Sequence, residues 1–221
     1  MEAEYKVCRL MNPICIDGDW EKPQLKSVEA IQLNFSMGSR PKFRPLVLIK
    51  MAYDPDNLYL IFKVEDQFVR CITQHYNGPV WEDSCVEFFF SADQGSFEKY
   101  FNLEINCGGT PLMYYNLIPR KDFKIVADED LSNLKIAHSM PKVVENEIIE
   151  PVRWTIECKI PVSLLSKYGE ILNPSPGVIW KANFYKIADK TSNPHYLTWS
   201  LVEQVIPDFH LPEFFGKLVF Q

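Results

Sequence analysis

Apolar residues recur at every second position in several short runs, and this alternation constrains the fold more than any other feature of the chain. Residues 44–53 and 57–66 are rich in β-branched and aromatic side chains, and Asp54, Pro55 and Asp56 between them favour a turn. The pattern predicts a β-hairpin. Further strand-like runs occupy residues 83–92, 98–107, 111–116, 152–161, 177–188, 196–200 and 216–221.

Signals for helices are few. The best covers residues 161–169, where Pro161 favours a helix start, Leu164 and Leu165 give an apolar face, and Gly169 favours an end. We therefore predict an all-β fold, an antiparallel β-sandwich of two sheets with about ten strands and one short helix. A length of 221 residues allows two small domains, but sandwiches of this size commonly form one, so we expect a single domain over residues 1–221.

Charge and hydropathy exclude several classes of partner. The 29 acidic and 23 basic residues are scattered, and without clustered Lys and Arg we expect no binding to nucleic acid. No stretch approaches the roughly 20 apolar residues of a membrane helix, so we expect no membrane partner.

The N-terminus lacks a secretion signal, so the sequence as given predicts a cytoplasmic location, or an extracytoplasmic one if a leader has been removed. The six cysteines form no CxxC pair and are expected to be reduced thiols. The oligomeric state is not predicted.

The runs 83–92 and 98–107 form a second predicted hairpin, with Gly95 and Ser96 in its loop. Alternation gives each strand one apolar and one polar face. If Ser91 faces Glu98, antiparallel counting places polar residues opposite one another. The expected polar face then pairs Glu87 with Asn102, Cys85 with Glu104, and Asp83 with Asn106.

Trp81 immediately precedes this hairpin and adds an aromatic ring at the edge of its polar face. A flat ring beside carboxylates and amides is how proteins generally hold a sugar, because the ring covers the apolar face of the pyranose while the polar groups bond its hydroxyls. The alternatives are an ordinary solvated sheet face and a core tryptophan. Trp20, Trp154 and Trp180 lie within or beside apolar runs and are expected in the core.

Six segments of the chain, in order, form a more specific pattern. They are IDGDW (16–20), AYDPDNLYLIFKVED (52–66), WEDSCVEFFFSAD (81–93), YFNLEINCGGT (100–110), WTIECKIP (154–161) and FHLPEFFGKLVF (209–220). Together they resemble carbohydrate-binding module family 9 over almost the whole chain. The resemblance implies a sandwich of two antiparallel sheets. It also implies a sugar-binding site, since the founding members are xylanase-attached modules that hold the reducing-end sugar of glycans between two tryptophans.

The family's W-x-D-x-x-x-E pattern matches Trp81 and Glu87, and the resemblance implies that these residues stack on and bond the sugar. For the second stacking aromatic it offers Trp199, with Phe209 and His210 as alternatives. The founding modules also use an arginine, but the strand after Glu87 has no basic residue past Lys99. They hold structural calcium, and the resemblance allows calcium here, with DGD at 17–19 the nearest candidate but no assigned ligands.

We therefore expect carbohydrate binding without catalysis, a mono- or oligosaccharide stacked on Trp81 and bonded by Glu87, with help from Asn102, Glu104 or Asn106. Hydrolysis is the first alternative, because Glu87 and Glu104 on one face fall within the roughly 5 to 9.5 Å separation of glycosidase carboxyl pairs. A haem-binding sandwich is the second, since the chain has six methionines and four histidines, although these form no motif. The histidines are His75, His138, His195 and His210.

Overall fold

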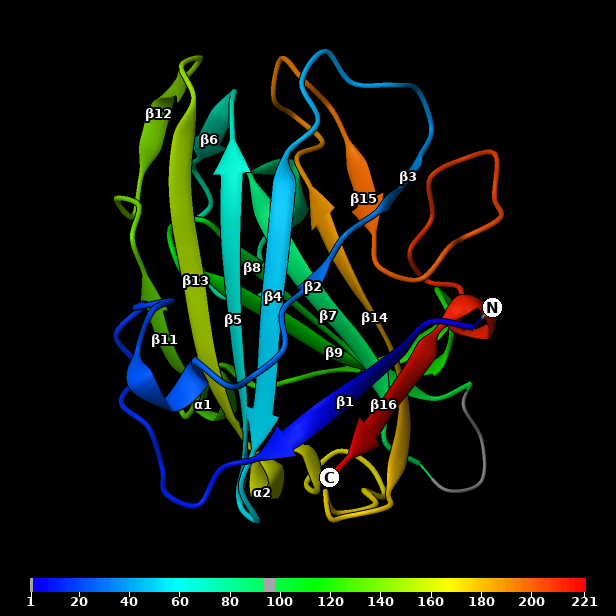
Figure 1. The fold of residues 1–221 in the computed structure, drawn as a ribbon. Helices are drawn as coiled ribbons and strands as arrows, with labels where there is room; N and C mark the ends of the chain where they lie inside the picture. The colour runs from blue at the N-terminus through cyan, green and yellow to red at the C-terminus, as the bar shows by residue number, and fades with distance from the viewer. Residues whose placement is uncertain (1, 94–97) are drawn as a thin grey trace.

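Two curved layers of β-strands pack face to face in the computed structural model, which describes residues 2–93 and 98–221 (Figure 1). The layer that we call the first sheet contains, in spatial order, β10 (Asp122–Ile125), β9 (Pro111–Ile118), β8 (Tyr100–Asn106), β7 (Cys85–Ser91), β14 (Ile179–Ile187) and β16 (Gly216–Phe220). The second sheet contains β4 (Leu46–Tyr53), β5 (Asn57–Asp66), β13 (Val152–Pro161) and β11 (Lys135–His138). The predicted all-β sandwich is confirmed.

Strand β1 (Glu4–Arg9) joins the two sheets. Its first part pairs with β16 and its last two residues pair with β4, both in parallel, whereas the prediction was of antiparallel pairing throughout. At this corner one sheet continues into the other, and β1 runs in the same direction as both of its partners (Figure 1). The sandwich is therefore closed at this corner by main-chain hydrogen bonds.

All nine predicted runs contain strands, but the described residues hold sixteen strands rather than about ten. The additional strands are mostly short edge pieces without a long alternating pattern. They include β2 (Ile31–Gln32) and β3 (Phe35–Met37). The predicted run 196–200 contains β15 (Tyr196–Thr198), which pairs with β14 on one side and with β3 on the other. A separate small sheet pairs β6 (Val69–Cys71) with β12 (Val144–Ile148).

Two short α-helices are present where one was predicted. Helix α2 (Val162–Leu165) occupies the first half of the predicted helix and buries both leucines. Helix α1 (Asp128–Leu131) was missed, although its three acidic residues suit the positive end of a helix dipole. The remaining helical turns are the 3-10 segments η1 (Pro23–Leu25), η2 (Val80–Glu82) and η3 (Pro212–Phe214). No helix in the ranges 2–93 and 98–221 has the length and apolar character needed to cross a bilayer.

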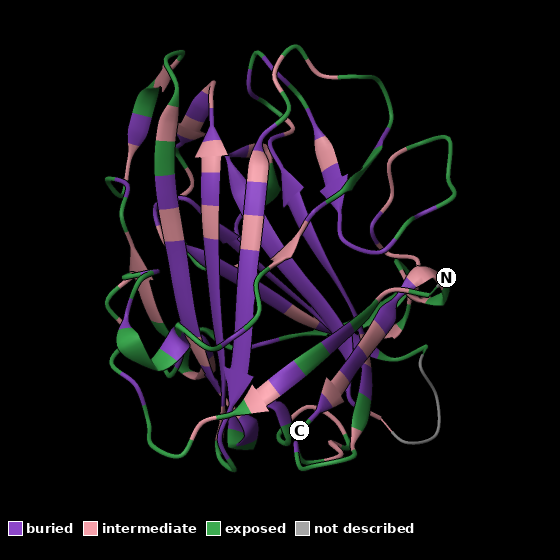
Figure 2. Ribbon diagram, in the orientation of Figure 1, coloured by how far each residue is buried: buried purple, intermediate pink, exposed green. Residues whose placement is uncertain are grey.

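The main core lies between the sheets, and central strands such as β5, β7 and β8 are buried along most of their length, whereas the edge strand β10 is exposed (Figure 2). Phe88 stacks on Phe90 and on Phe184, with ring centroids 4.5 and 4.9 Å apart. Trp154 and Trp180 are fully buried in this core, and Trp20 is buried in a smaller cluster outside the second sheet. These three placements agree with the prediction.

The register of the second hairpin differs from the predicted one by two residues. Glu87 lies opposite Glu104, Cys85 opposite Asn106, and Phe89 opposite Asn102. The prediction assumed that Ser91 faces Glu98, but β8 begins only at Tyr100, so the connection is longer; the predicted turn residues Gly95 and Ser96 lie outside the described part of the chain. A slip of two leaves every side chain on its predicted face.

The polar face of this hairpin is not solvated as a typical sandwich face would be. A second apolar cluster, which includes Phe89, Tyr185 and Phe209, covers it from outside, and the residues that it buries include Glu87, Asn102 and Glu104. The cover comes from residues beyond β15, which carry no strand pattern in the sequence. The site described below lies under this cover.

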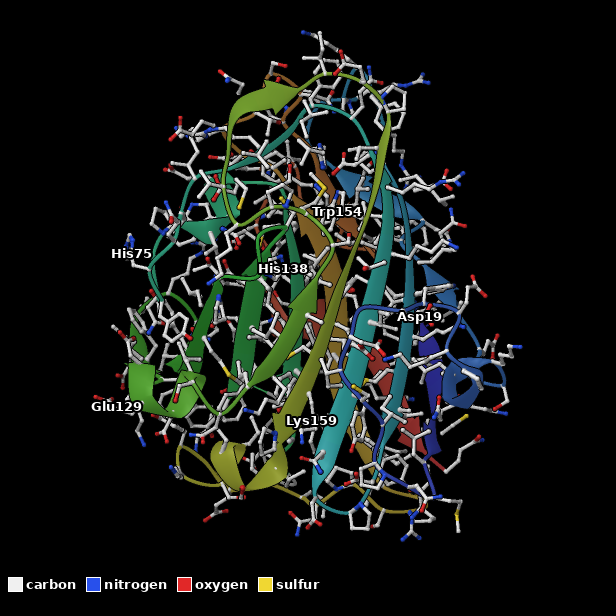
Figure 3. All side chains as sticks on the ribbon, turned by 90° about the vertical axis from the view of Figure 1, so that its left-hand side faces the viewer. Asp19, His75, Glu129, His138, Trp154 and Lys159 are labelled. Atoms are coloured by element: carbon white, nitrogen blue, oxygen red, sulfur yellow. The ribbon has the colours of Figure 1, made fainter. Side chains whose placement is uncertain are left out.

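The outer face of the second sheet is covered by the segment around DGD, the candidate calcium turn (Figure 3). Here the Lys22 ammonium lies 2.7 Å from Asp17 Oδ1, 2.6 Å from Glu157 Oε1 and 2.6 Å from the carbonyl of Cys15. The other oxygen of Glu157 accepts the backbone N–H groups of Asp17 and Gly18 at 2.8 Å. These oxygens do not fit a calcium ion, because a lysine of the chain already occupies the position between them.

We predict that Lys22→Met lowers the free energy of unfolding by about 3 kcal/mol, because it leaves Glu157 buried without its cation. Urea denaturation followed by circular dichroism measures the change, and Lys26→Met, at an exposed position four residues on, is the matched control and should have almost no effect. Equal midpoints for the two variants would show that the Lys22 contacts do not stabilise the fold.

Candidate functional site

A hollow of about 310 Å³ opens on the outer face of the first sheet. Strands β7, β8, β9 and β14 form its floor, and the segment 207–210 and β15 form one wall. Five of the seven predicted site residues line it: Trp81, Glu87, Asn102, Glu104 and His210. Its size is at the lower end of the range for small-molecule sites.

The centre of the floor is polar and buried. Glu87 and Glu104 lie directly opposite one another on β7 and β8, with exposed fractions of 2% and 5%. Asn102 donates to Glu104 Oε1 at 3.0 Å and accepts from Asn116 at 2.7 Å, so it holds the Glu104 carboxyl in place. Within residues 2–93 and 98–221, neither Glu87 Oε2 nor Glu104 Oε2 has a hydrogen-bond partner.

Burial changes the protonation of this carboxyl pair. Desolvation raises the pKa of Glu104 to about 7, although Asn102 and Arg120 both act to lower it. Desolvation and the neighbouring Glu104 charge raise the pKa of Glu87 well above its ordinary value, against the opposing effect of Lys186. Around neutral pH the pair therefore retains at least one proton.

Trp81 stands at the end of the floor where β7 begins. It belongs to η2 and is 37% exposed, whereas its neighbour Val80 is fully buried and anchors the turn. The carbonyl oxygen of Trp81 accepts the N–H of Asp189 at 3.1 Å, which ties the turn to the segment after β14. The indole is thus a half-exposed ring on a backbone that is fixed by the buried Val80 and by the hydrogen bond from Asp189.

Asn106 was predicted to line the site and does not. Its amide donates to Asp83 Oδ2 at 3.0 Å and to the carbonyl of Thr73 at 2.9 Å, while its own oxygen accepts the N–H of Thr110 at 2.9 Å. All of its strong hydrogen-bonding groups are used inside the protein. Asn106 therefore positions the turn that carries Trp81 instead of facing a ligand.

The wall opposite the β9 side comes from the C-terminal part of the chain. Phe209 stacks on Tyr185 with centroids 4.1 Å apart, and the Tyr185 hydroxyl donates to the carbonyl of Phe209 at 3.2 Å. Tyr196 of β15 meets Phe209 edge-on and donates its hydroxyl to Asp189. Phe209 is only 7% exposed, whereas Tyr196 is half-buried, and both rings line the hollow.

The three residues considered for the second stacking ring are placed differently. Phe209 and His210 line the hollow, whereas Trp199 lies in the main core against Phe184 and is absent from the lining. Trp199 follows β15 with its side chain on the inner face, so the prediction for it is corrected. His210 bonds the Tyr100 hydroxyl at 2.7 Å, and burial lowers its pKa to about 4, with help from Arg120.

Sequence reasoning missed an arginine at the mouth of the hollow. Arg120 lies in the turn between β9 and β10 with a φ of 59°. Its guanidinium donates hydrogen bonds to both carboxylate oxygens of Asp208. The strand after Glu87 has no basic residue past Lys99, and this arginine follows the next strand along the chain, β9. Tyr114 and Tyr196 were missed as well, although both are aromatic residues within predicted strands.

Of the four histidines considered for haem, His138, His195 and His210 form hydrogen bonds within the protein, and His75 is exposed. Nδ1 of His138 bonds the carbonyl of Met140 at 2.7 Å. His195 is buried and bonded on both ring nitrogens, to Lys186 and to the carbonyl of Asn193, each at 2.8 Å. In the described ranges no three His, Cys, Asp or Glu side chains gather in a way that would hold a metal ion.

The raised pKa of Glu104 predicts a pH-dependent stability. Because the folded protein binds this proton more tightly than the unfolded chain, its free energy of unfolding should be greatest below the ordinary pKa of 4.5 and fall as pH rises to about 7, by on the order of 1 to 3 kcal/mol. Glu104→Gln should flatten this slope in urea denaturation at stepped pH. The exposed Glu145→Gln is the control, and an equal slope in both variants would contradict the assignment.

Comparison with known proteins finds relatives of this chain and of its fold. A solved structure from Bacteroides uniformis ATCC 8492, provisionally assigned as a carbohydrate-binding protein, shares 30% identity with a TM-score of 0.89, and the match covers 100% of both chains. Two structures of a family 9 carbohydrate-binding module from Caldicellulosiruptor kristjanssonii, in complex with cellotriose and with glucose, share the fold at 12% and 13% identity, with TM-scores of 0.66 and 0.63. Those matches cover 99% of this chain and 94% and 96% of the module chains.

A comparison with curated protein sequences finds no match. The sequence model of carbohydrate-binding family 9, in contrast, matches residues 20–220, which include every residue that lines the hollow. By this match and by its likeness to the Bacteroides structure, the chain belongs to carbohydrate-binding family 9.

Proposed function

We propose that this protein binds a mono- or oligosaccharide in the hollow, with one sugar ring stacked on Trp81 and its hydroxyls bonded by Glu87. The observation that carries the proposal is a half-exposed indole beside a buried polar floor. A second, independent support is family membership, together with the two related modules whose structures contain cellotriose and glucose.

The chemistry of the hollow suits a pyranose. The indole offers a flat apolar surface of the kind that covers sugar C–H groups, and Glu87 and Glu104 offer acceptor oxygens for hydroxyl groups. Because Asn102 already bonds Glu104 and Asn116, its contribution is mainly to orient the Glu104 carboxyl. Tyr196 and His210 also line the hollow, and their rings are the candidates for the second aromatic surface that stacks on the sugar.

The size of the hollow limits the ligand and its affinity. A volume of about 310 Å³ suits one or two sugar rings, with any further rings lying outside. A site this small buries little area, so we expect dissociation constants on the order of micromolar to millimolar. The ligand is then a chain end or a short oligosaccharide.

Trp81→Ala should abolish most sugar binding while leaving the fold intact, because the ring contributes contact area and its side chain is not packed in the core. We expect affinity for cellotriose, measured by titration calorimetry, to fall at least about tenfold. Tyr76→Ala is the matched control, since Tyr76 is 38% exposed, lies in the same connection and does not line the hollow. Unchanged affinity in the Trp81 variant, with binding by the parent protein, would reject the stacking role.

Binding without hydrolysis is the second expected outcome. Incubation with cellotriose and a panel of glycans should release no reducing sugar above a blank, even though Glu87 and Glu104 are adjacent and the pKa of Glu104 is about 7. Release that disappears in Glu104→Gln would instead identify a glycosidase with this carboxyl pair.

A further inference from the structure

Two buried carboxyl oxygens lie at the floor of the hollow. They are Oε2 of Glu87 and Oε2 of Glu104, each buried and each without a partner among residues 2–93 and 98–221. Since Glu87 and Glu104 are register partners, their Cβ atoms lie about 5 Å apart, and the two carboxyl groups face the same small volume. A buried acceptor without a donor is costly, so a ligand that supplies donors at this point gains from it.

The positive charges near the pair are engaged elsewhere. Arg120 is bonded through its guanidinium to Asp208 at the mouth of the hollow. Lys186 lies in register with Val86 and so faces the core side of the sheet, where its ammonium bonds Asp66 and His195. In the described part of the chain, no lysine lines the hollow.

The remaining titratable groups around the pair are neutral near pH 7. Burial holds the pKa of His210 near 4, so its imidazole carries no charge. Burial also raises the pKa of Tyr100, Tyr114 and Tyr185, so their phenols stay protonated. Asp208 and Arg120 offset each other at the mouth of the hollow, so the ionisation of the Glu87 and Glu104 pair, which retains at least one proton around neutral pH, decides the charge at the floor.

We propose that the Glu87 and Glu104 pair recognises a protonated amine on the sugar, so that the hollow prefers an amino sugar to the matching neutral sugar. This inference rests on the proposed function, because it assigns the class of sugar bound at the same site. An ammonium group carries three donors and one positive charge, which suits two buried carboxyl oxygens without partners in the described part of the chain and favours ionisation of their carboxyl groups. A hydroxyl carries one donor and no charge.

The size of the preference follows from the strength of the hydrogen bonds. A hydrogen bond to a charged partner contributes about 1.4 kcal/mol more than a neutral one, which corresponds to about a tenfold difference in affinity. Binding of the cation also favours the ionised form of Glu104. Below the pKa of that carboxyl the complex should therefore release a proton.

The test uses three monosaccharides that differ only at carbon 2, namely glucose, glucosamine and N-acetylglucosamine. Titration calorimetry of the full chain at about pH 7 should show glucosamine binding about tenfold more tightly than the other two. Repeating the titration at about pH 6 in two buffers of different ionisation enthalpy should show roughly one proton released per glucosamine bound and none per glucose.

Glu104→Gln should remove both the preference for glucosamine over glucose and the proton release, and Glu145→Gln, an exposed acid outside the hollow, should change neither. Equal affinity for glucose and glucosamine in the parent protein overturns the inference but leaves the proposed function standing. No binding of any of the three sugars or of cellotriose overturns the proposed function itself. A preference for glucosamine that survives in both Glu104→Gln and Glu87→Gln overturns the assignment to this pair.

Discussion

The stacking of Phe209 on Tyr185 holds a strandless segment against the first sheet, and the candidate site depends on this contact. Without that cover the face that carries Glu87 and Glu104 would be an ordinary wet face of a sandwich. With it, the same carboxyl groups are buried and their pKa values rise. The strands thus supply the polar side chains of the floor, while the covering segment around Phe209 buries them and so raises the pKa of the two carboxyl groups.

The faces of the strands could be predicted from the sequence, whereas their cover could not. Alternation in β7 and β8 correctly separates Phe88 and Leu103 from Glu87 and Glu104, because period two is a local property of a strand. The register depends on the length of the connection, which alternation does not define, and the prediction was wrong there by two residues. This shift of two residues left Glu87 and Glu104 on the predicted face of the sheet. It changed their cross-strand partners, because it placed the two glutamates opposite each other.

The residues that sequence reasoning misplaced share a physical cause. Trp199 and Asn106 were assigned to the site by type and position, but a tryptophan can pack inward and an amide can be used fully by neighbouring loops. Arg120 was missed because it reaches the hollow from a turn with positive φ, where no periodic pattern operates. Such contacts join parts of the chain far apart in sequence, and only the folded arrangement reveals them.

The distribution of indole rings has a practical consequence. Of the five tryptophans, Trp20, Trp154, Trp180 and Trp199 are at most 8% exposed, while Trp81 at the hollow is 37% exposed. An aqueous quencher such as iodide therefore reaches a single emitter, and that emitter stands where a ligand would shield it. Under the proposed function, the fluorescence of Trp81 reports occupancy of the hollow without an added label.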